Sequence, residues 1–302
     1  MGAAPAALSF AAVDLATFLV QCLNAVQYGL LLFLLASGLT LIFGIMGVIN
    51  LAHGSFYMIG AYMAFVLAPY FADNFLLMLL VGVVLAAALG FVLEWVFFSF
   101  LYEREHLQQV LMTYALILVF EEVRSLTVGN DVHGVAVPSW LQGSIPLGEL
   151  MTYPVYRLFA SAACIVLAIG MYLVVNRTRL GMMIRAGASN RDMVRGLGVD
   201  IKTLYRIVFA AGVALAALAG MIAAPMASVY PGMGGAVLII CFVVVVIGGI
   251  GSITGALVAS LLVGFVDTFG KVFFAEYSGV GVYLLMTIIL IWRPEGLLTK
   301  RA

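Results

Sequence analysis

The chain has 302 residues, and its 14 basic and 14 acidic side chains make up only 9% of the sequence, whereas 65% of the residues are hydrophobic. Soluble domains carry about 25% charged residues, so a globule of this composition would expose large apolar patches to water. The composition excludes a soluble enzyme, a disordered chain and a nucleic-acid-binding protein, and it indicates an integral membrane protein.

The predicted elements are membrane helices, because long stretches of the chain carry no charge. No charged residue lies between Asp14 and Asp73 or between Arg206 and Asp267, and a membrane crossing takes about 20 apolar residues. The apolar runs are continuous, which excludes an outer-membrane barrel and leaves helices, whose backbone groups bond internally. We therefore expect an all-α polytopic membrane protein, a single transmembrane domain over residues 1–302. Its eight or nine membrane or half-membrane helices are expected at residues 18–43, 55–68, 75–100, 107–128, 154–176, 205–229, 236–248, 254–271 and 279–293.

Lys and Arg residues predict how the chain is oriented in the membrane. The segment 177–206 holds seven of the 14 basic residues, whereas the loop 129–153 holds none. Because basic loops stay in the cytoplasm, we expect 177–206 to be cytoplasmic and 129–153 to be external. Lys300 and Arg301 place the C-terminus inside, and the number of crossings then places the N-terminus outside. The first 20 residues lack a basic region, so no cleavable signal peptide is predicted.

Glycine and polar residues interrupt two of the apolar runs. The first break includes Gly44, Gly47, Asn50, His53, Gly54 and Tyr57, and the second includes Gly248, Gly249, Gly251 and Ser252. Unwound backbone at membrane depth is tolerated only inside protein or along a wet cavity, and paired breaks in two halves of a chain indicate a transport site near the midplane. The other interpretation is a pair of cytoplasmic turns, in which glycine permits tight geometry.

Several ionisable residues lie within or near the apolar runs. His53 has two possible roles, which are direct contact with a solute and a hydrogen bond to carbonyl groups exposed by the break. Glu121 and Arg124 are spaced as an i, i+3 pair and Asp267 and Lys271 as an i, i+4 pair, so we expect structural pairing there. Glu94, Glu121, Glu122 and Arg124 are expected near helix ends or paired among themselves.

We expect the chain to bind no cofactor or metal of its own. The second break lacks both the GxGxxG of a dinucleotide site and the GK[ST] of a P-loop. Cys22, Cys164 and Cys241 lie far apart in the sequence, without the spacing of a metal motif or a disulfide framework.

The basic segment contains a predicted short helix. Asn190 suits its N-cap, Asp192 its first turn and Gly198 the position after its end. Arg191 and Arg195 project at i, i+4, while an apolar stripe is expected from Met193, Val194 and Leu197. Such a helix either lies on anionic lipid headgroups or inserts its stripe into a groove of a soluble partner.

Five motifs follow one another from about residue 18 to residue 299, at 38–61, 181–186, 190–200, 246–255 and 293–297. Together they resemble the LivH-type permeases, which are membrane subunits of ABC importers for branched-chain amino acids. The external loop 129–153 matches this family least. The resemblance implies a LivH/LivM-like permease fold that works by alternating access in the bacterial inner membrane.

The resemblance also implies partners and roles. The short cytoplasmic helix would dock on an ATPase subunit, which favours the partner over lipid. The positions carried over are Arg185, Ala186, Ser189, Asn190, Arg191, Asp192, Arg195 and Gly198. The implied partners are a second, LivM-like permease, two LivG/LivF-like ATPase subunits that bind ATP and Mg, and a periplasmic solute-binding protein, without nucleic acid.

The solute stays open among the classes that the resemblance suggests. Branched-chain or other hydrophobic amino acids come first, and related systems carry urea and short amides or aromatic carboxylates. A self-sufficient channel or an ion-coupled transporter would need intramembrane carboxylates, for which Glu94 and Asp267 are the candidates.

Overall fold

The structure, a computed structural model, describes residues 15–71, 74–102, 104–146 and 152–298. Over these residues the chain is an all-α polytopic membrane protein, as predicted. Its helices are α1 (Leu15–Met46), α2 (His53–Leu67), α3 (Phe75–Val96), α4 (His106–Thr127), α5 (Val155–Arg177), α6 (Arg179–Ser189), α7 (Arg191–Gly196), α8 (Ile201–Ala223), α9 (Met233–Gly248), α10 (Ile253–Phe273) and α11 (Ser278–Trp292).

Apolar runs make these helices, and polar caps decide where several of them begin. Asn74 accepts a hydrogen bond from the Leu77 N–H at the start of α3, and Ser252 accepts one from Gly255 at the start of α10. Such caps satisfy N–H groups that have no partner inside the helix. Helices α1, α3, α5, α8 and α10 are long and apolar enough to cross a membrane.

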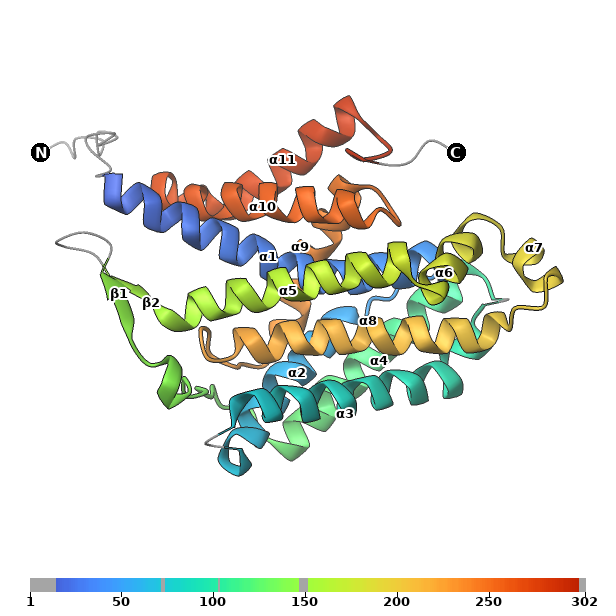
Figure 1. Cartoon of the computed structure of the whole chain (residues 1–302), viewed down its shortest axis with the longest axis horizontal. Helices are drawn as coiled ribbons and strands as arrows, with labels where there is room; N and C mark the ends of the chain where they lie inside the picture. Colours follow the sequence, from blue (N-terminus) through green and yellow to red (C-terminus); the bar gives the residue numbers. More distant parts are fainter. Residues whose placement is uncertain (1–14, 72–73, 103, 147–151, 299–302) are drawn as a thin grey trace, which may run out of the picture.

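The long helices run along one axis, with distinct structures at the two ends (Figure 1). One end carries α6 and α7 and is here called the α7 end. The other carries the start of α1 and a hairpin of strands β1 (Ser144–Pro146) and β2 (Thr152–Pro154), which pair antiparallel, and is called the hairpin end. Lys300 and Arg301, on which the predicted side of the C-terminus depends, lie outside the described residues.

Helix α1 forms the centre of the bundle. Its most apolar window is 83% buried within the chain, against 22% for α5, so α5 presents most of its surface outwards. Small residues let the inner helices approach closely. A side chain on Gly60 of α2 would collide with the Ala217 carbonyl of α8, and one on Gly220 of α8 would collide with the Tyr57 carbonyl of α2.

The segment 177–206 is more ordered than a loop. Helix α6, which the sequence analysis did not predict, begins where Thr178 accepts a hydrogen bond from the Gly181 N–H. The turn into α6 is tight, since a side chain on Gly181 would meet the Val174 and Val175 carbonyls. The Arg185 guanidinium donates to the Val175 carbonyl and so fastens α6 to the end of α5.

Candidate functional site

The first break is a re-entrant segment. Helix α1 continues to Met46, and Gly47 then reverses the chain in the left-handed region, at φ +65°. Residues 47–52 return into the bundle, so that α2 begins beside the middle of α1. The His53 Nε2 lies 3.0 Å from the Leu35 carbonyl oxygen. Leu35 is eleven residues before Met46, or about 16 Å along the helix axis.

His53 fastens the start of α2 to α1. Its side chain is 0% exposed, and its Nε2 donates a hydrogen bond to the Leu35 carbonyl of α1. One expectation was a hydrogen bond to carbonyl groups of the break itself, and the structure instead gives the bond to α1. The Asn50 side-chain oxygen accepts from the Ala52 N–H, 3.1 Å away. The Asn50 Nδ2 and the His53 Nδ1 are buried and have no hydrogen-bond partner within the described residues.

A second half-helix meets α2 at this depth. Helix α9 begins after Gly232, whose φ is +79°, and a side chain on Gly54 would collide with the Gly234 carbonyl oxygen. From this junction α2 runs to the hairpin end, where its Phe65 ring stacks on His133 at 4.2 Å, and α9 runs to the α7 end. The N-terminal ends of both helices, which carry partial positive charge, therefore meet inside the bundle.

The second predicted break lies at one end of the bundle and not near its middle, where a transport site is expected. Residues 249–252 form a tight turn between α9 and α10, with positive φ at Gly249 and Gly251. This turn lies at the α7 end, because a Cβ on Gly44 would be 3.1 Å from the Gly251 Cα. The interpretation as a turn is correct for this break. Its re-entrant counterpart is 224–232, where Pro225, Pro231 and Gly232 were the signal that sequence reasoning missed.

Leu297 and Leu298 lie against this turn. The Leu297 N–H donates to the Ile247 carbonyl at 2.8 Å, and the Ser252 hydroxyl donates to the Leu298 carbonyl at 2.9 Å. The first of these bonds satisfies the Ile247 carbonyl group, which lies at the C-terminus of α9 and has no partner in its own helix. The motif 293–297 therefore stabilises the α9–α10 turn.

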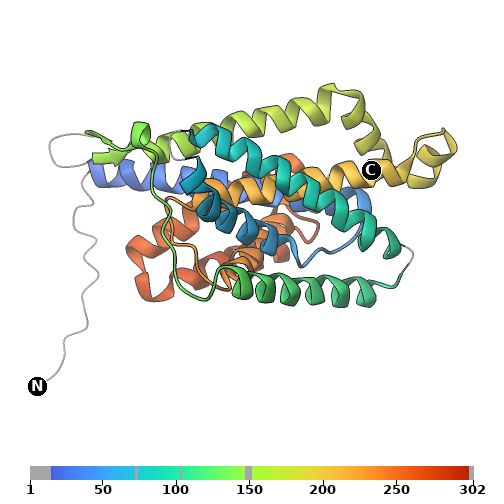
Figure 2. The ribbon, with the colours of Figure 1, turned by 90° about the horizontal axis from the view of Figure 1, so that it is seen from below.

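Helix α7 projects beyond the bundle at its end (Figures 1 and 2). The predicted N-cap is confirmed, since the Asn190 side chain accepts from the Met193 N–H at 3.0 Å. The predicted apolar stripe is divided between two faces: Val194 is buried, while Met193 is 65% and Leu197 is 79% exposed. The exposed pair is separated by one helical turn and has no cover within the described chain.

The residues to which the resemblance assigns a coupling role lie in α6, in α7 and in the turn after α7. Arg191 touches the first break, because a Cβ on Gly47 would be 2.6 Å from the Arg191 Nη2. Gly198 has a φ of +85° and ends the α7 turn, and Arg195 is exposed. Of the others, Arg185 is held at the α5–α6 turn, while Ala186, Ser189 and Asp192 are exposed.

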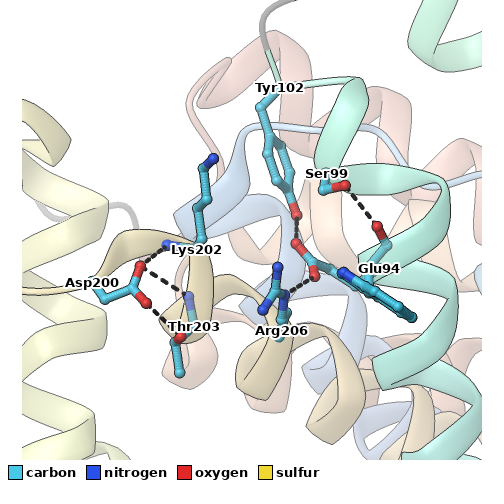
Figure 3. Close-up of polar contacts among 8 residues, drawn as sticks. Glu94, Ser99, Tyr102, Asp200, Lys202, Thr203 and Arg206 are labelled. Atoms are coloured by element: carbon cyan, nitrogen blue, oxygen red, sulfur yellow. Dashed lines mark hydrogen bonds and ion pairs between the residues drawn. The ribbon is translucent and has the colours of Figure 1, made fainter.

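A buried ion pair joins the start of α8 to the end of α3 (Figure 3). The Arg206 Nε lies 3.2 Å from one Glu94 carboxylate oxygen, and the Tyr102 hydroxyl donates to the other at 2.5 Å. Burial and this hydrogen bond raise the pKa of Tyr102 above its ordinary value. Glu94 therefore lies near the end of α3, as one of the two expectations had it. It pairs across the bundle with Arg206 and not with the charged residues of α4, which was the other expectation.

The other expected pairs are confirmed. Arg124 and Glu121 approach to 3.1 Å, and Lys271 and Asp267 to 2.5 Å. Asp200 caps α8 beside the buried pair (Figure 3), and its bonds to Thr203 lower the pKa of its carboxyl group.

Comparison with known proteins identifies the family. The family described as "Branched-chain amino acid transport system / permease component" matches residues 21–290. The chain is 31% identical to the high-affinity branched-chain amino acid transport system permease protein BraD of Pseudomonas aeruginosa, over 94% of this chain and 96% of that protein. It is 28% identical to the permease protein LivH of Escherichia coli, over 94% and 96%, and 27% identical to LivM of the same species, over 88% and 67%. No solved structure matches. The chain belongs to the family of permease components of branched-chain amino acid transport systems.

Proposed function

We propose that this chain is the permease subunit of an ATP-driven importer in the bacterial inner membrane. The α7 end faces the cytoplasm and the hairpin end faces the periplasm, as the seven basic residues of 177–206 indicate. A second, LivM-like permease completes the path, two ATPase subunits bind ATP and Mg, and a periplasmic protein delivers the solute at the hairpin end. The relatives LivH and LivM, each named as a permease of one transport system, support the pairing of two permeases.

One observation carries the proposal, which is that α7 touches the first break. Arg191 of α7 lies on Gly47, while Met193 of the same helix and Leu197, its C-cap, are 65% and 79% exposed. Exposed apolar side chains at i, i+4 are what a helix presents to a groove on a partner. A force applied to α7 therefore reaches the re-entrant segment directly.

The same force has a second route. Helix α8 begins a few residues after α7, and its Arg206 is bonded to Glu94 of α3. Tyr205 next to it donates to the Ile45 carbonyl at the end of α1, at 3.5 Å. When the ATPases close, α7 moves and takes α8, the end of α1 and the end of α3 with it. The closed junction of Gly54 and Gly234 is then the element that must open to pass solute.

The proposed path residues follow from this junction. Four of them lie close to the start of α2, namely Asn50, His53, Gly54 and Tyr57. The start of α2 is connected to α7 through Gly44 and Gly47. The turn at Gly248, Gly249, Gly251 and Ser252 is proposed as a hinge rather than a binding site, since it lies at the α7 end against Gly44.

The solute class that we propose is the branched-chain or other hydrophobic amino acids. Two half-helix N-termini favour a carboxylate, which urea and short amides lack. Aromatic carboxylates are the second candidate, because they share this charge.

A transporter coupled to an ion is the weaker alternative, because both candidate carboxylates already have a partner. Glu94 is bonded to Arg206 and Tyr102, and Asp267 is paired with Lys271. A carboxylate that binds a coupling ion must exchange its partner, whereas both of these are already neutralised by a cation.

Co-purification with the ATPase subunits tests the proposal. Leu197→Asp, which places a charge at the exposed C-cap of α7, is expected to remove the ATPase from the complex. Arg179→Glu is the control, since it changes an exposed residue at the same end outside α7. If the chain alone moves solute into liposomes without ATP, the importer proposal is wrong.

A further inference from the structure

Residues 129–143, here called the strap, join α4 to strand β1 and run as the green trace at the hairpin end of Figure 2. The start of the strap is fixed to α4, because the Arg124 guanidinium donates to the Gly129 carbonyl at 2.6 Å. Its end is fixed to α5, because the Val155 N–H donates to the Gly143 carbonyl at 3.0 Å. Both ends of the strap are therefore held by helices of the bundle.

The middle of the strap connects the two half-helices through one residue, His133. Its backbone forms an antiparallel bridge with Val229 of the re-entrant segment 224–232, with N–H to carbonyl distances of 2.9 and 2.8 Å. Its ring stacks on Phe65, near the hairpin end of α2, with 4.2 Å between the ring centres. Val229 is 0% exposed and lies four residues before the start of α9. His133 therefore holds the segment that leads into α9 beside α2.

This bridge is the sole backbone link between the re-entrant segment and a distant part of the chain, among the residues that the structure describes. The other backbone bonds of the segment run to the last turn of α8, within the segment, or to the first turn of α9. A backbone hydrogen bond contributes only modestly to stability once its exchange with water is counted. Two such bonds can therefore break while the helices on either side stay folded.

The bridge opposes the opening of the junction between the half-helices. The junction opens when Gly234 of α9 moves away from Gly54 of α2, which it now touches. Val229 lies only five residues before Gly234, and His133 ties it to the far end of α2. The start of α9 is thus released from α2 only when the bridge opens.

Helix α8 leads directly into this bridge. It ends at Ala223, one residue before the re-entrant segment, and its first turns carry the bond of Arg206 to Glu94. A displacement of α8 along its axis would therefore pull on Val229, while the strap stays fixed to α4 and α5. The bridge is the place where these two parts separate.

We propose that the strap is a latch at the hairpin end. The bridge of His133 and Val229 keeps the half-helices together in the resting chain, and it opens in each transport cycle when α8 moves. This inference rests on the proposed function for the source of that movement, but the opening of the bridge can be measured separately from uptake.

A disulfide across the bridge tests the proposal in the assembled importer. Residues that exchange both backbone bonds have Cα atoms about 5.5 Å apart, a separation that a disulfide spans. His133→Cys with Val229→Cys is made in a chain whose three cysteines, Cys22, Cys164 and Cys241, are replaced by alanine. The oxidised variant is expected to lose ATP-driven uptake, and reduction of the disulfide is expected to restore it.

Pro146→Cys with Thr152→Cys is the matched control. These residues lie opposite each other in the β1–β2 hairpin and are both exposed, so their disulfide lies at the same end without joining the strap to the re-entrant segment. Uptake by this variant is expected to be the same in the oxidised and reduced states. Uptake by the bridge variant that oxidation leaves unchanged, with the disulfide verified by mass spectrometry, would overturn the proposal, as would an equal loss in both variants.

Hydrogen exchange on the unsubstituted chain measures the bridge directly. The amides of His133 and Val229 are expected to be protected in the resting complex and to exchange faster when ATP and solute-loaded binding protein are added, whereas exchange in the β1–β2 hairpin stays the same. Protection of the two amides that does not change would overturn the latch. A complex that moves no solute with ATP would contradict the importer proposal, whereas uptake that the disulfide does not stop would contradict the latch alone.

Discussion

The ion pair of Glu94 and Arg206 offers the sharpest prediction about stability and coupling. Arg206→Leu leaves the Glu94 carboxylate, which is 0% exposed, without a cation, whereas Glu94→Leu leaves an Arg206 side chain that is 26% exposed and can reach water. We therefore expect Arg206→Leu to be the more destabilising of the two single variants.

The magnitude follows from burial. Removing one partner of a buried ion pair costs about 3–5 kcal/mol, and the lower end applies here because water screens Arg206 and Tyr102 still donates to Glu94. We expect about 3 kcal/mol for Arg206→Leu and about 2 kcal/mol for Glu94→Leu, which also strands the Tyr102 hydroxyl. The double variant replaces the pair by apolar groups and is expected to be no worse than the milder single variant.

The assay is a double-mutant cycle on the purified chain. Unfolding free energies of the two single variants and the double variant, measured in one detergent, give a coupling energy that we expect to be at least about 3 kcal/mol. If the single effects add, or if both single variants fall within about 0.5 kcal/mol of the parent, the two side chains do not act as a buried pair and the second route of force from α7 loses its basis.

Three further predictions concern the junction and its two supports. Gly54→Ala must push α2 away from the Gly234 carbonyl, so uptake by the assembled importer is expected to be lost. The control is Gly170→Ala, where no atom lies within 4 Å of the added carbon, and uptake is expected to stay unchanged there. Equal uptake in the two variants would contradict the closed junction. Asn190→Ala removes the cap of α7 and is expected to destabilise that helix by about 1 kcal/mol, which faster amide exchange in α7 than in α6 would reveal; protection equal to that of the parent would argue against the cap. Ser252→Ala removes the bond to the Leu298 carbonyl and is expected to raise proteolysis of the C-terminal residues without changing that of the hairpin end.

Local patterns predicted much of this fold. The expected spans 55–68 and 107–128 differ from α2 and α4 by only one or two residues at each end, because apolar runs and their polar boundaries are local properties. The cap at Asn190 and the pair of Asp267 and Lys271 were likewise predictable, since each depends on residues within one helical turn.

Contacts between distant segments were not predictable in this way. Glu94 and Arg206 are 112 residues apart, and nothing local to either residue indicates the other. Met193, Val194 and Leu197 form one apolar stripe by spacing alone, but the bundle buries only Val194. The expected spans 205–229 and 236–248 divide the re-entrant segment 224–232 between a helix and a loop, because its depth depends on the contact of Gly234 with Gly54.

We propose that α7 transmits ATPase motion to the half-helix junction, and solute-stimulated ATP hydrolysis tests this coupling most directly. In the reconstituted importer, Arg191→Glu with Arg195→Glu is expected to abolish the stimulation of hydrolysis by solute and binding protein while membrane insertion stays intact. Arg177→Glu with Arg179→Glu makes the same charge change at the same end outside α7 and is expected to retain stimulation. Stimulation that is unchanged in the α7 variant, or lost equally in both, would contradict the account.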